Sequence, residues 1–346
     1  MAINQMRPTS KADGDGRAAA GRWTFTALAT RYREYGLVAV LVLEMAVCAF
    51  ASPSFLTTTN IINITRAAAA IGIIAVGMTF VVLTAGIDLS VGGAVSLVGM
   101  VIASSLSSWE NAVVAVVVAL AAGAVIGLFN GFLVAKFRVP ALIVTLGTMY
   151  LLTSGAQLWN NGGPLPVRNA TLQSLGSNYV GPIPVPVIVW AVVVLIGWWL
   201  LNQTRFGRHV YAVGGGFEAA KLTGIRIDRV LIGVYVISGV LAALASLLYV
   251  GRLATASPLT GDGLELQVIA SVVVGGVSLF GGRGNLRDTV VGVLILTVLQ
   301  NGLNLVGVSG FFQTMSLGAA LLIAVLLSPE ADLKGHLLSL VRKGSR

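Results

Sequence analysis

Charged residues are scarce in this chain. They make up 10% of its 346 positions, whereas hydrophobic residues make up 56%; an average soluble domain has about 25% charged residues. The mean hydropathy is +0.90. This composition excludes a single soluble core and predicts an all-α polytopic membrane protein with apolar surface facing lipid. Gly123, Gly127 and Gly131 recur on one face of an expected helix, and they predict a close helix–helix contact.

Residues suited to catalysis or metal binding are few. Cys48 is the only cysteine, which excludes an intramolecular disulfide. The two histidines, His209 and His336, have no carboxylate at metal-ligand spacing. No GxxxxGK[ST] sequence occurs, so the chain has no P-loop for ATP. We therefore expect no catalytic residue, metal or cofactor. The net charge is +9, but the basic residues form no face interspersed with aromatic side chains. This argues against nucleic acid as a partner.

Apolar segments near the ~20 residues needed to cross a bilayer predict about ten transmembrane helices. They are residues 36–51, 62–85, 89–107, 111–135, 140–159, 185–202, 230–250, 264–280, 289–306 and 311–328. Together they predict a membrane domain over residues 36–328. A polar, basic arm (1–35), expected to be disordered, precedes it, and a short tail (329–346) follows.

The basic residues predict the orientation of these spans. If the N-terminus is cytoplasmic, 19 of the 22 lysines and arginines fall on the inside, as the positive-inside rule requires. Both termini and the polar loop 204–229 are then cytoplasmic, and residues 160–184 form the largest external loop. Asn130-Gly131 and Asn301-Gly302 are each followed at equal spacing by a Leu-Gly pair. This suggests an inverted repeat of helices 2–5 and 7–10.

The polar loop 204–229 separates two apolar halves of the chain. It carries five basic residues, a glycine run at 214–216 that we interpret as a bend, and a short helix-like piece at 218–222 stopped by Gly224. Glu218 lies near the start of this piece and Lys221 in its next turn, as the helix dipole favours. We interpret the loop as a cytoplasmic docking element.

Charged residues at membrane depth are functional candidates because burying them in lipid is costly. Asp88 lies in the glycine-flanked break TAGIDLSVGG (84–93). With Ser90 it either caps the next helix or lines or gates a translocation pathway. Glu265, after residues 261–263, is interpreted as another cap. Four other polar residues are candidates for the pathway: Asn130, Thr145, Gln300 and Asn304. Hydrogen bonding between helices explains their presence equally well.

Four motifs carry a family resemblance. Glu218, Ala219 and Ala220, with Gly224 following, resemble the EAA loop of bacterial ABC importer permeases, although residues 225–228 (IRID) lack the proline that often continues that pattern. Residues 85–92 (AGIDLSVG), 139–148 (VPALIVTLGT) and 275–284 (GGVSLFGGRG) occur in the order found in ribose-type simple-sugar permeases. The similarity extends over residues 36–328.

This resemblance implies the permease subunit of an ATP-driven importer that moves a monosaccharide, a ribose-like pentose or a hexose, from periplasm to cytoplasm. The implied partners are ABC ATPase subunits, a periplasmic sugar-binding protein, membrane lipid and a second permease subunit, identical or different. The implied location is the bacterial inner membrane. By the same resemblance, Glu218, Ala219, Ala220 and Gly224 belong to a coupling helix seated on the ATPase.

Three alternatives stay open. An ion-coupled secondary carrier is disfavoured because Asp88, Glu44 and Glu265 form no ion relay along one helix. A membrane-embedded enzyme or scaffold is disfavoured by the lack of a catalytic set. A branched-chain amino-acid-type ABC permease is disfavoured by the AGIDLSVG stretch.

Overall fold

The computed structural model describes residues 35–326, and within that range the chain is almost entirely helical. The first helix is Tyr35–Ala51. The next four helices are α2 (Thr58–Leu83), α3 (Ser90–Trp109), α4 (Ala112–Lys136) and α5 (Ala141–Trp159). The later helices are α6 (Ala170–Ser177), α7 (Val185–Gln203), α8 (Arg205–Gly215), α9 (Phe217–Leu222), α10 (Ile227–Leu253), α11 (Leu264–Val274), α12 (Leu286–Leu305) and α13 (Gly310–Leu326).

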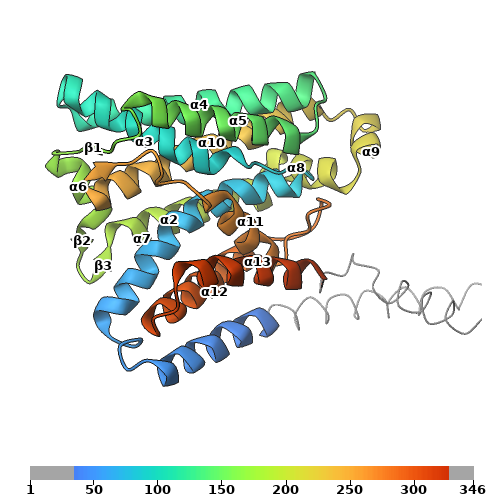
Figure 1. The fold of residues 1–346 in the computed structure, drawn as a ribbon. Coiled ribbons are helices and arrows are strands. Elements are labelled where there is room, and N and C mark those ends of the chain that lie inside the picture. The colour runs from blue at the N-terminus through green and yellow to red at the C-terminus, as the bar shows by residue number, and fades with distance from the viewer. Residues whose placement is uncertain (1–34, 327–346) are drawn as a thin grey trace, which may run out of the picture.

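Two small antiparallel sheets join segments at one end of the bundle. Their strands are β1 (Leu165–Pro166), β2 (Tyr179–Val180), β3 (Ile183–Pro184) and β4 (Thr255–Ala256). β1 pairs with β4, and β2 pairs with β3. Figure 1 shows these strands and α6 at one end of the molecule and α8 and α9 at the other.

Each of the ten predicted segments corresponds to an apolar helix in the described part of the chain. Seven of these helices are long and apolar enough to cross a membrane, and three are shorter: Tyr35–Ala51, Leu264–Val274 and Gly310–Leu326. The all-helical, polytopic prediction is therefore confirmed, whereas the count of ten spans stays a prediction. The segment predicted over 264–280 was too long. Its helix ends at Val274, because Gly276 takes a left-handed conformation (φ +86°) and a glycine-rich loop follows.

α2 is the centre of the bundle. Its sequence is apolar on all sides, which is typical of a helix surrounded by protein, and 89% of its most apolar stretch is buried, against 22% for α4. The core groups side chains of α2 with side chains of α7, α10, α11 and α12, while the outer faces of α4, α5 and α7 stay exposed and apolar. These outer faces are the surface available to lipid or to another membrane subunit.

The predicted glycine contact is confirmed between α4 and α10. A Cβ atom on Gly123 would collide with the carbonyl oxygen of Gly239, and one on Gly127 would collide with that of Tyr235. A Cβ atom on Gly131 would lie 2.8 Å from the Cα atom of Ile232. The two backbones therefore approach more closely than any side chain would allow, as small residues permit in lipid.

Candidate functional site

The polar loop folds into two short helices, α8 and α9, separated by Gly216. Gly214 and Gly215, which we expected in a bend, are the last two residues of α8, so only Gly216 of the glycine run lies at the bend. Gly224 ends α9 as predicted. Its φ of +80° is left-handed, and Ile225 N–H donates to the Ala220 carbonyl at 3.2 Å, as in a glycine-terminated helix end.

α9 presents one buried residue and several exposed ones. Of the motif residues, Ala220 is buried, whereas Glu218 and Ala219 are exposed. Two apolar side chains that we did not single out from the sequence are also exposed: Leu222 at 89% and Phe217 at 42%. α9 therefore carries an exposed apolar side chain at each of its two ends. The signal was present in the sequence, since these residues flank the EAA motif directly.

A glycine junction connects α8 to the end of α2. Gly282 N–H donates to the Leu83 carbonyl at 2.9 Å. A Cβ atom on Gly214 would collide with that same carbonyl oxygen and would lie 2.5 Å from Gly282 N. α8, the C-terminal end of α2 and the glycine-rich loop 275–284 therefore meet backbone to backbone. Any displacement of α8 toward this junction must also move the end of α2.

A second contact joins α8 to the same loop. Tyr211 on α8 donates its phenolic hydrogen to the Gly284 carbonyl at 3.0 Å. Burial raises the pKa of this phenol, and the negative charge of Asp288 raises it further. The hydroxyl therefore stays protonated at neutral pH and keeps its role as a donor.

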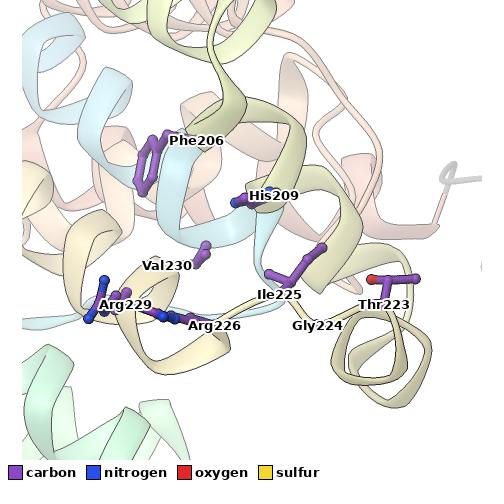
Figure 2. A pocket seen from close by; sticks show the side chains of 8 residues that line it. All are labelled: Phe206, His209, Thr223, Gly224, Ile225, Arg226, Arg229 and Val230. Carbon is purple, nitrogen blue, oxygen red and sulfur yellow. The ribbon is translucent and has the colours of Figure 1, made fainter.

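Two hollows lie beside the connection from α9 to α10. The first has a volume of about 440 Å³, and Figure 2 shows its lining residues: Phe206, His209, Thr223, Gly224, Ile225, Arg226, Arg229 and Val230. The ionisable residues that line it are all basic. The second, of about 340 Å³, contains the ion pair between Lys136 Nζ and Asp228 Oδ2, 2.6 Å apart. The surface around α9 is thus positively charged and suits an acidic partner.

Asp88 is the centre of a buried polar network between α2 and α3. Its Oδ1 accepts hydrogen bonds from Ser90 N (3.0 Å) and Ser90 Oγ (2.6 Å), and its Oδ2 accepts one from Ser238 Oγ on α10 (2.7 Å). Asn130 Nδ2 on α4 donates to Ser90 Oγ at 2.8 Å, and Thr148 Oγ1 on α5 donates to Asn130 Oδ1 at 2.7 Å. Four helices, α3, α4, α5 and α10, are therefore tied to the break that contains Asp88.

The remaining pathway candidates occupy different environments. Thr145 donates to the Ile87 carbonyl at 3.1 Å, so it borders the Asp88 network. Gln300 accepts from Gln267 at 2.6 Å and links α12 to α11. Asn304 is exposed near the end of α12. The structure thus brings Asp88, Ser90, Asn130 and Thr145 into one buried cluster, apart from Gln300 and Asn304. Sequence reasoning missed Ser238 and Thr148, because ordinary serines and threonines in apolar helices carry no distinctive signal.

Comparisons with known proteins give a consistent result. A family model described as "Branched-chain amino acid transport system / permease component" matches residues 60–327. The ribose import permease protein RbsC of Escherichia coli K12 is 44% identical over 311 residues, which cover 89% of this chain and 96% of that protein. RbsC of Bacillus subtilis is 42% identical over 278 residues (80% and 86%). The L-arabinose permease AraH of E. coli K12 is 35% identical over 294 residues (85% and 89%). No solved structure matches the chain.

Proposed function

This chain belongs to the family of ABC-importer permease components that contains these ribose permeases, and on that premise we propose that it is the membrane subunit of an ATP-driven sugar importer. The identity of 41–44% to ribose permeases over most of the chain supports a monosaccharide as the cargo. The family description names branched-chain amino acids, but the relatives reported above carry sugar names. The chain lacks a P-loop, so ATP hydrolysis belongs to partner ATPase subunits and the permease itself is non-catalytic.

α9 is the proposed coupling helix. It combines the motif residues Glu218, Ala219 and Gly224 with the exposed apolar side chains of Phe217 and Leu222. Basic residues surround it on both sides. This combination supports docking of α9 into an ATPase groove that is apolar at its base and acidic at its rim.

The route from α9 into the membrane is the observation that supports this function most strongly. α9 follows α8 after a single residue, α8 meets the end of α2 at Gly214 and Leu83, and α2 continues into the break that contains Asp88. Closure of the ATPase dimer would move α9, and the glycine junction would transmit that movement to the helices around Asp88. A ligand shifts an equilibrium between two conformations only if its contacts differ between them. Here ATP would make different contacts with the open and the closed ATPase dimer.

The proposed topology places both termini and α8–α9 in the cytoplasm, with ten spans over residues 36–328 and the loop 160–184 in the periplasm. Residues 1–34 and 327–346 lie outside the described part of the chain, so the whole predicted tail and all of the predicted arm except Tyr35 stay predictions. The exposed apolar faces of α4, α5 and α7 support contact with inner-membrane lipid and with a second permease subunit. A periplasmic sugar-binding protein would deliver the cargo to the outer loops.

Reconstitution tests this function. The permease, its ATPase and its binding protein are placed in liposomes with labelled ribose, without an ion gradient. We expect uptake that requires both ATP and the binding protein, and ATP hydrolysis that rises with sugar-loaded binding protein. Uptake driven by a proton or sodium gradient in liposomes that lack the ATPase would instead establish a secondary carrier.

A further inference from the structure

The segment between α10 and α11 turns back into the depth of the bundle. After β4 the chain runs through residues 257–263 as a series of turns, and α11 then starts at Leu264 and has only 11 residues. Figure 1 shows the orange segment after α10 leaving the α6 end and α11 lying near the middle of the bundle. We call residues 257–263 the re-entrant segment.

Two contacts fix the depth of this segment. Ser246 on α10 donates to the Val95 carbonyl at 2.7 Å, and the next residue of α3, Ser96, accepts from Gly261 N–H at 2.9 Å. Gly261 therefore lies level with Ser246. That serine is about 27 Å along α10 from Asp228 and about 10 Å short of the outer end of the helix at Leu253. Gly261 also packs against Gly92 of α3, which is about 26 Å along that helix from its other end at Trp109. The re-entrant segment thus reaches into the ~30 Å hydrocarbon region.

A close glycine contact holds the segment against α3. A Cβ atom on Gly261 would collide with the carbonyl oxygen of Gly92. A Cβ atom on Gly92 would collide with the Gly261 carbonyl oxygen and with the Glu265 carboxylate. Gly92 belongs to the AGIDLSVG motif, so this motif positions the re-entrant segment as well as the Asp88 network. The segment is therefore built into the fold rather than loosely attached.

The exposed side of the re-entrant segment carries a charge. Asp262 is exposed, and Leu259 and Leu266 on either side of it are 58% and 54% exposed. Lipid cannot cover this face, because a carboxylate at membrane depth is costly. Non-helical backbone at that depth is tolerated only where it is buried in protein or lines a water-filled cavity. This chain alone leaves Asp262 exposed, so either a second protein chain or water must cover it.

We propose that the re-entrant segment lines the aqueous sugar pathway between this permease and its second subunit, with Asp262 facing the water. The carboxylate accepts hydrogen bonds from hydroxyl groups, which suits a polyhydroxylated cargo. The inference rests on the proposed function for the identity of the cargo and for the second subunit, but not for the presence of water.

Cysteine accessibility tests the proposal in cells that produce the complete importer. Asp262→Cys is introduced into a Cys48→Ala chain, which removes the single native cysteine. A charged, water-soluble thiol reagent is then applied to spheroplasts. Two control variants are treated alike: Arg168→Cys, exposed in the external loop, and Leu195→Cys, exposed on the apolar outer face of α7.

We expect Asp262→Cys to react at least about tenfold faster than Leu195→Cys, because one unit of pKa rise in apolar surroundings lowers the reactive thiolate about tenfold. Labelling at position 262 should also abolish ribose uptake, while labelling of Arg168→Cys should leave it intact. A rate equal to that of Leu195→Cys would overturn the proposal, and so would full uptake after complete labelling at 262. If the unlabelled parent chain takes up no ribose, the proposed function fails, whereas the rate comparison still decides whether water reaches the segment.

Discussion

Removing the Ser238 hydroxyl should weaken the fold more than removing an equivalent hydroxyl on the same helix. Ser238 and Ser246 are both buried on α10, and each donates one hydrogen bond at 2.7 Å. The acceptors differ. Ser238 donates to the Asp88 carboxylate, whereas Ser246 donates to the backbone carbonyl of Val95. The pair Ser238→Ala and Ser246→Ala therefore isolates the contribution of the carboxylate.

The expected magnitudes follow from these acceptors. A hydrogen bond to a charged group contributes about 1.5–3 kcal/mol, and a neutral bond between membrane helices averages about 0.6 kcal/mol. Loss of the Ser238 hydroxyl also leaves Asp88 Oδ2 buried without its donor. We therefore expect Ser238→Ala to lower the free energy of unfolding by about 1–2 kcal/mol more than Ser246→Ala, which is about a 5- to 30-fold difference in equilibrium constant.

Unfolding of both variants by SDS in mixed micelles, followed by circular dichroism, measures this difference. The parent chain gives the reference. Equal destabilisation by the two substitutions would refute the reasoning, because it would mean that the Asp88 side chain accepts the Ser238 hydrogen bond no more strongly than a backbone carbonyl does. The network would then be an ordinary helix contact rather than a charged hub.

Three further predictions concern the end of the bundle that carries α8 and α9. Leu222→Asp should reduce co-purification of the ATPase without lowering the melting temperature of the permease, because this side chain is 89% exposed. Gly214→Val should abolish ATP-driven uptake, whereas Gly215→Ala should retain it. The reason is that an added Cβ atom collides with the backbone at Gly214 but meets nothing within 4 Å at Gly215. Equal uptake by the two variants would remove the glycine junction from the coupling route. Lys136→Gln should change the free energy of unfolding by less than about 1 kcal/mol, because the ion pair of Lys136 with Asp228 is about half exposed. A larger decrease in the free energy of unfolding, measured by denaturation, would show that this pair stabilises the fold more than its exposure suggests.

The positions of the helices could be predicted from the sequence because each apolar segment is close to the length of a bilayer crossing. The exception was the segment 264–280. Its apolar composition continues past Val274, but the backbone at Gly276 turns left-handed and ends the helix. Hydropathy alone does not report such a backbone change. For the same reason the sequence did not reveal that residues 257–263 turn back against Gly92 of α3.

The components of the Asp88 network were partly predictable. A charged residue in a glycine-flanked break is conspicuous, and Asn130 and Thr145 are conspicuous as polar groups in apolar helices. Their convergence depends on the packing of α4 and α5 against α3, which no local pattern encodes. Ser238 lies 150 residues after Asp88 in the chain, so its role as a donor to that carboxylate appears only in the folded structure.

The docking element was the most predictable part of the candidate site. Its helix, its glycine terminator and its basic surroundings all follow from local sequence. The contact of Gly214 with Leu83 was not predictable, because it joins segments that are distant in the chain. The glycine run by itself predicts a bend, whereas close approach of two backbones is the reason that Gly214 must lack a side chain.

Crosslinking of α9 to the ATPase tests the coupling role most directly. Leu222→Cys, in a chain whose Cys48 is replaced by alanine, is treated with a bifunctional thiol–amine reagent in membranes that contain the complete importer. We predict a covalent permease–ATPase product whose yield changes on addition of ATP, and no labelling of position 222 by an impermeant thiol reagent applied to intact cells. Labelling from outside intact cells, or the absence of any ATPase product, would contradict the role of α9 as the coupling helix.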